Sequence, residues 1–178
     1  MIIDVSNPWA AIVGRGPEGR NEMISDIAQR LRADGLSVRG FTHEGVEESS
    51  GPGIDAVELF GVERAAIART SPHPDICNYL FQPAGFEAVD RWCGEDGDVL
   101  FMEIGRLEAK GEGYWPTVTR RFVGPRTLLV LSIRPHVLAS IALDLPDPAA
   151  FIELPYDGEQ AAVFAGELLA AWRLGQSN

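Results

Sequence analysis

An apolar segment, a glycine-rich loop and an amphipathic helix follow one another near the start of the chain. Residues 9–13 (WAAIV) are uniformly apolar, which is typical of a strand buried on both faces of a sheet. The loop GRGPEGRN covers residues 14–21, and apolar residues then recur at helical spacing until Asp34-Gly35, where a helix would end. This order predicts a central strand whose carboxyl end faces the N-terminus of a helix, and it favours the α/β class.

The remaining chain continues the alternation of strands and helices. Residues 53–60 and 62–68 indicate an antiparallel hairpin with its turn near Gly61, preceded by a polar, glycine-rich stretch at 44–53. The three prolines in residues 71–83 favour an irregular segment. Further elements are expected as strands at 36–41, 98–104, 127–133 and 150–154, as helices at 84–92 and 158–174, and as an amphipathic stretch at 108–122. We therefore predict one α/β domain over residues 1–178, with a mostly parallel sheet flanked by helices and an antiparallel β-hairpin insertion.

Length and charge limit the partners that the chain can have. Its 178 residues are 46% hydrophobic, enough for one buried core, and its formal net charge of -11 excludes a broad cationic surface for nucleic acid or an anionic membrane. The N-terminus has no basic signal sequence, and the longest apolar stretch is interrupted by Arg134-Pro135-His136. The cysteines, Cys77 and Cys93, form no CxxC pair. We expect a cytoplasmic protein with no metal site, no nucleic-acid partner and no membrane segment.

The glycine-rich loop partly matches the phosphate-binding loop (P-loop), G-x-x-x-x-G-K-[ST]. In that motif the backbone N–H groups and the helix N-terminus hold phosphates, while the lysine and the hydroxyl hold the terminal phosphate and Mg²⁺. Gly14 and Gly19 have the motif's spacing, but Arg20 replaces the lysine and Asn21 replaces the hydroxyl residue. Glu18 also places a negative charge inside the loop, which Arg15 or Arg20 would have to offset. The alternative is a simple glycine-rich turn between a strand and a helix.

A second segment makes the phosphate-binding interpretation stronger. Residues 98–107 (DVLFMEIGRL) form an apolar strand that ends in a carboxylate, as does the second motif of nucleoside triphosphatases. In that motif a glutamate polarises the attacking water, a role that Glu103 could fill. Other polar candidates are His43 at the end of a strand, Arg134 after another, and Tyr114, for which a structural role remains the simpler alternative.

Four sequence elements, in the same order along the chain, resemble the motifs of one protein family. They are the glycine-rich loop and residues 35–44 (GLSVRGFTHE), 59–69 (LFGVERAAIAR) and 102–108 (MEIGRLE). Over about residues 9–135 the chain resembles the small P-loop nucleoside triphosphatases, which are similar to nucleotide phosphatases and kinases. It is also similar, more loosely, to an uncharacterised P-loop-like family found near molybdate-transport genes, whose loops are likewise degenerate.

The resemblance assigns roles to residues one by one. Phosphate or nucleotide binding would fall to Gly14, Arg15, Gly16, Gly19, Arg20 and Asn21. Glu103 would be the catalytic glutamate, whereas Met102 stands where the family has an aspartate that organises Mg²⁺. Asn21 and Met102 thus replace the two groups that would organise Mg²⁺. We therefore expect a nucleoside triphosphate as the ligand and no secure place for Mg²⁺.

Three hypotheses follow from these replacements. The first is a nucleotide- or anion-binding or adapter module with little hydrolysis. The second is a slow nucleoside triphosphatase that uses Glu103, an enzyme that would cleave a phosphoanhydride. The third is an interaction scaffold that binds a protein partner through its acidic surface and needs no nucleotide.

Overall fold

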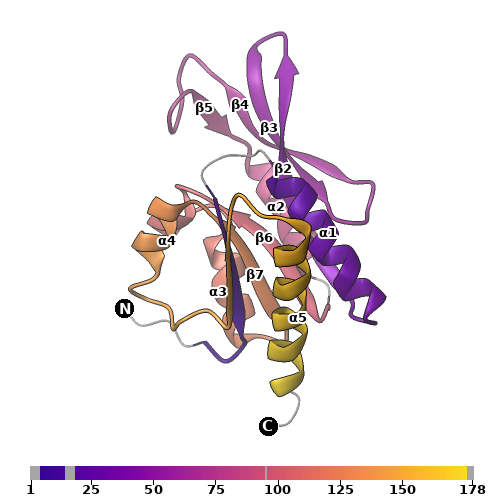
Figure 1. The fold of residues 1–178 in the computed structure, drawn as a ribbon. Helices are drawn as coiled ribbons and strands as arrows, with labels where there is room; N and C mark the ends of the chain where they lie inside the picture. Colours follow the sequence, from indigo (N-terminus) through magenta and orange to yellow (C-terminus); the bar gives the residue numbers. More distant parts are fainter. Residues whose placement is uncertain (1–4, 15–18, 95, 176–178) are drawn as a thin grey trace.

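One eight-stranded mixed sheet organises the chain (Figure 1). The computed structural model describes residues 5–14, 19–94 and 96–175. The strands are β1 (Trp9–Val13), β2 (Val38–Glu48), β3 (Gly51–Glu58), β4 (Arg64–Thr70), β5 (Tyr79–Phe81), β6 (Val99–Ile104), β7 (Leu128–Ile133) and β8 (Ala150–Glu153). Their order across the sheet is β5-β4-β3-β2-β6-β7-β1-β8. Strands β2, β6, β7, β1 and β8 pair in parallel, and β2 to β5 pair antiparallel.

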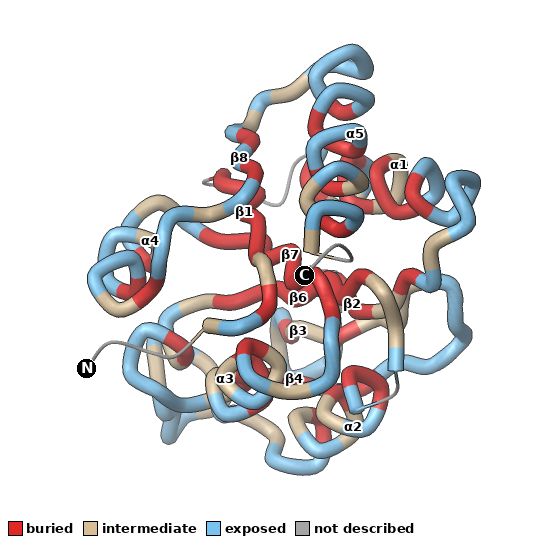
Figure 2. Tube along the Cα trace, turned by 90° about the horizontal axis from the view of Figure 1, so that it is seen from below, coloured by how far each residue is buried: buried red, intermediate tan, exposed pale blue. Residues whose placement is uncertain are grey.

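Helices cover both faces of the parallel part of the sheet. They are α1 (Arg20–Ala33), α2 (Pro83–Gly94), α3 (Trp115–Val123), α4 (Pro135–Ile141) and α5 (Gly158–Leu174), with a 3₁₀ turn η1 (Glu108–Lys110). One apolar core lies between the sheet and α1 with α5, and the other lies between the sheet and α2, α3 and α4. Figure 2 shows the buried strands as a layer between these helices. Strands β1, β6 and β7 are buried along their whole length, which explains their continuous apolar sequences.

Strand β2 belongs to both parts of the sheet and changes partner at Gly40. Residues 38–40 pair in parallel with β6, and residues 41–48 pair antiparallel with β3. Gly40 has φ +130°, and a Cβ atom there would lie 2.0 Å from the backbone oxygen of Phe101. Only glycine fits this close approach of two strands. The antiparallel strands therefore extend beyond the helical layers, as Figure 1 shows at the top of the molecule.

The predicted fold class is confirmed, and three local predictions need correction. The hairpin of residues 53–60 and 62–68 is present as β3 and β4, but the polar stretch 44–53 continues β2 and begins β3. Residues 71–83 contain the short strand β5, and helix α4 was not predicted at all. Within the described residues no helix is both long enough and apolar enough to cross a membrane.

Candidate functional site

The carboxyl end of β6 and the start of α1 bring together the predicted site residues Arg20 and Glu103. Arg20 is the first residue of α1, directly after Gly19, whose left-handed backbone (φ 72°) leads the loop into the helix. Glu103 is the penultimate residue of β6, and its neighbour Met102 packs in the core on the α2 and α3 side of the sheet. Because adjacent strand residues point to opposite faces, Glu103 points towards α1.

Arg20 and Glu103 form a buried ion pair. Nη2 of Arg20 lies 2.5 Å from Oε1 of Glu103, and the two side chains are only 6% and 9% exposed. A charge-assisted hydrogen bond of this kind is stronger than a neutral one because both partners are ionised. The arginine at the position of the motif's lysine therefore has a carboxylate partner from the protein itself.

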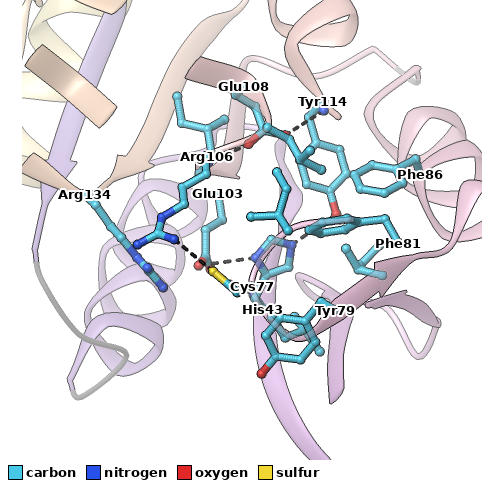
Figure 3. Close-up of a pocket in the computed structure, with 16 residues that line it drawn as sticks. His43, Cys77, Tyr79, Phe81, Phe86, Glu103, Arg106, Glu108, Tyr114 and Arg134 are labelled. Carbon is cyan, nitrogen blue, oxygen red and sulfur yellow. Dashed lines mark hydrogen bonds and ion pairs between the residues drawn. The ribbon is translucent and has the colours of Figure 1, made fainter. Parts of the chain in front are cut away.

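His43 supplies further hydrogen bonds to Glu103 (Figure 3). The backbone N–H of His43 donates to Oε2 at 3.0 Å, and its ring Nδ1 lies 3.3 Å from Oε1. On the other side of the ring, Nε2 lies 3.1 Å from the hydroxyl of Tyr114. Burial alone would raise the pKa of Glu103, but the charge and hydrogen bonds of His43 and the charge of Arg20 outweigh it, so the pKa lies below its usual value.

The lowered pKa of Glu103 predicts a pH-dependent contribution to stability. Since the folded-state pKa is below the unfolded value, the contribution is present above about pH 4.5 and is lost as the pH falls through the folded pKa. We expect the gap in unfolding free energy between wild type and Glu103→Gln to narrow as the pH is lowered from neutral to about 3. Urea denaturation across this range measures the gap, and a gap that stays constant or widens in acid would contradict the assignment.

Asn21 lies at the same place but does not complete a magnesium site. Its Nδ2 donates to the backbone oxygen of His43 at 2.9 Å, and its Oδ1 is buried with no hydrogen-bond partner among the described residues. Mg²⁺ is held through carboxylates, phosphates and waters, whereas Asn21 offers a single amide oxygen and Met102 is buried in the core. Among the described residues no group of three or more His, Cys, Asp or Glu side chains could hold a metal ion. The residues that the structure describes at this place do not fit Mg²⁺.

Gly14, the first glycine of the loop, has a structural role at the end of β1. The backbone N–H of Gly14 donates to the oxygen of Ile133 at 3.1 Å, and a Cβ atom on Gly14 would lie 2.2 Å from Cδ1 of Leu154. Gly14 therefore lets the residue after β8 pack against the end of β1. The predicted phosphate contacts Arg15 and Gly16 lie outside the described residues.

His43 and Tyr114 have a larger part in the site than the sequence pattern indicates, and Glu108 is a further buried residue for which no role was predicted. Glu108 is buried and accepts hydrogen bonds from the backbone N–H groups of Gly105, at 2.6 Å, and Tyr114, at 2.8 Å. Burial raises the pKa of Glu108 and, with the charges of Glu108 and Glu103, that of Tyr114. The signal for His43 was its place at the predicted end of a strand, but no sequence pattern indicated that Tyr114 would reach it from the start of α3.

Comparisons with known proteins identify the fold. Neither a protein-family model nor a curated protein matches the sequence. The solution structure of a human cancer-related nucleoside triphosphatase is similar with a TM-score of 0.65 and 19% identity, over 92% of this chain and 96% of that one. The crystal structure of THEP1 from the hyperthermophile Aquifex aeolicus is similar with a TM-score of 0.62 and 20% identity, over 91% and 97% of the two chains. The chain therefore has the fold of the P-loop nucleoside triphosphatases.

Proposed function

We propose that the protein binds the polyphosphate of a nucleoside triphosphate beside the start of α1 and hydrolyses it little or not at all. The observation that carries this proposal is the buried ion pair between Arg20 and Glu103. The pair joins the position that would bind the terminal phosphate to the position that would activate water. In the ligand-free protein the Arg20 guanidinium is therefore engaged by Glu103, and the Glu103 carboxylate is engaged by Arg20.

The start of α1 supports anion binding. Its N-cap is Gly19, which offers no side-chain cap, so within the described residues the first N–H groups of this 14-residue helix have no side-chain cap. Such a helix end carries partial positive charge and favours phosphate. A triphosphate has the negative charge needed to compete with Glu103 for the guanidinium of Arg20.

Unsatisfied polar atoms gather at the same place. Among the described residues, the buried side-chain atoms without a hydrogen-bond partner are Nε of Arg20, Oδ1 of Asn21 and Oγ of Ser132. Ser132 is the register partner of Glu103 on the neighbouring parallel strand, so its side chain is on the same face of the sheet. An unsatisfied buried polar atom costs about 1–3 kcal/mol. Their grouping supports a site arranged for a polar ligand.

The surroundings of Glu103 oppose its use as a general base. Both carboxylate oxygens accept hydrogen bonds or ion pairs from Arg20 and His43, and the pKa is lowered. An efficient general base has a pKa near the working pH and a free lone pair directed at the water. The carboxylate is instead engaged by Arg20 and His43, which supports binding with little turnover.

Nucleotide titration of wild type and Glu103→Gln tests this function. We expect ATP or GTP to bind wild type, and to bind Glu103→Gln about tenfold more tightly because Arg20 no longer has a carboxylate partner. Isothermal titration, with and without Mg²⁺ and with the diphosphates for comparison, measures these affinities. Glu167→Gln, an exposed charge loss on α5, is the matched control and should bind as wild type does.

The outcomes separate the three hypotheses. Absence of binding of any nucleotide to wild type would overturn the proposal and leave the scaffold hypothesis. Turnover by wild type that Glu103→Gln abolishes would instead establish a slow nucleoside triphosphatase. If the variant does not fold, nucleotide binding and turnover by wild type still test the proposal, because sustained turnover by wild type already contradicts it.

A further inference from the structure

A cavity of about 230 Å³ lies between the antiparallel extension and the carboxyl ends of the parallel strands (Figure 3). Its walls are largely apolar and come from the extension and α2, including Ile54, Ile67, Phe81 and Phe86. His43 and Glu103 lie along one side of it. No described residue of α1 lines the cavity.

Two arginines at one end of this cavity have no carboxylate partner among the residues that the structure describes. Arg106 follows β6 and Arg134 follows β7, and these neighbouring parallel strands end at the same edge of the sheet. Figure 3 shows both side chains extending to the same end of the cavity. Arg106 donates to Sγ of Cys77 at 2.9 Å, a weak acceptor, and within the described part of the chain neither guanidinium forms an ion pair.

The carboxylates of the cavity are already engaged. Glu103 is paired with Arg20 and His43, and Glu108 accepts from the backbone N–H groups of Gly105 and Tyr114. The two arginines are therefore the uncompensated charges of this cavity, in a chain whose formal net charge is -11. A positive end beside an apolar wall is complementary to an amphipathic anion.

We propose that this cavity binds a small organic acid whose carboxylate is held by Arg106 and Arg134 and whose apolar body, about one aromatic ring, packs against Phe81, Phe86 and the isoleucines. An apolar cavity of about 150 Å³ holds benzene, so this one has room for a ring with a short side chain. The proposal does not rest on nucleotide binding, because no described residue of α1 lines the cavity.

Isothermal titration of the full chain with 3-phenylpropionate, in the absence of nucleotide, tests the proposal. We expect saturable binding of this acid, and binding about tenfold weaker or worse for 3-phenylpropanamide, which keeps the ring and loses the charge. Acetate, which keeps the charge and lacks the ring, should also bind at least about tenfold more weakly. Arg134→Gln should weaken binding of the acid by about tenfold, whereas Arg173→Gln, an equal charge loss at an exposed position of α5, should leave the affinity unchanged.

Three results would overturn the proposal: no binding of 3-phenylpropionate to wild type, equal affinity for the acid and its amide, or equal losses in the two arginine variants. The last result would show a general electrostatic effect in place of a contact. Both arginines are exposed, so the variants should keep the fold, and circular dichroism checks this. Because nucleotide is absent, failure here leaves the triphosphate titration unaffected.

Discussion

Replacing Glu103 with glutamine should lower the free energy of unfolding by about 3–5 kcal/mol, because it leaves Arg20 as a buried charge without a partner. The Arg20 side chain is only 6% exposed, and its Nε already lacks a hydrogen-bond partner within the described residues. Glutamine keeps the shape of glutamate and can still accept hydrogen bonds, so the loss reports mainly on charge. Urea denaturation at neutral pH measures the effect.

The double variant Arg20→Met with Glu103→Gln separates the ion pair from the packing. With both charges removed, the desolvation cost also disappears, and we expect the double variant to be more stable than Glu103→Gln by about 2 kcal/mol. Asp26→Asn, which breaks the exposed pair with Arg30, serves as the comparison and should cost less than about 1 kcal/mol. If the loss of unfolding free energy in the double variant equals the sum of the losses in Arg20→Met and Glu103→Gln, the two side chains do not interact as described.

Replacing Gly40 with alanine should destabilise the protein by about 3 kcal/mol or more, through a positive φ angle and a backbone clash. The new Cβ would lie 2.0 Å from the oxygen of Phe101 and 2.7 Å from its nitrogen, and neither backbone atom can rotate away. Strand β2 or β6 would have to move at the point where β2 leaves the parallel sheet. Chemical denaturation measures the loss.

Gly45→Ala is the matched control for this prediction. Gly45 is on the same strand, its backbone is extended, and a Cβ atom there would meet nothing within 4 Å. Alanine should therefore be neutral or slightly stabilising at position 45, since it restricts the unfolded chain. Similar losses at Gly40 and Gly45 would mean that the close approach of β2 and β6 has no special importance.

The parallel half of the fold could be predicted because its strands are buried on both faces. Strands such as 9–13 and 128–133 are continuous apolar runs, and the helix after the glycine loop has its apolar residues at helical spacing. The extension was harder to predict, because its strands are partly exposed and the β2–β3 hairpin is rich in polar residues and glycine. Helix α4 is only 7 residues long, too short for a periodic pattern to indicate it.

The site could be predicted only as far as motif spacing reaches. The spacing placed Arg20 and Asn21 at the start of a helix and Glu103 near the end of a strand. It could not show that Arg20 turns to Glu103, since that contact joins residues distant in sequence and depends on side-chain direction. The contact between His43 and Tyr114 could not be predicted either, because it depends on how β2 and α3 pack.

Phosphate release from a bound nucleoside triphosphate is the measurement that tests the central claim most directly. Wild type is held with ATP or GTP at a concentration where titration shows it to be saturated, in the presence of Mg²⁺, and inorganic phosphate is followed over many hours. The ion pair between Arg20 and Glu103 predicts bound nucleotide with no release above the protein-free background. Sustained release that Glu103→Gln abolishes would contradict it and make Glu103 a catalytic base.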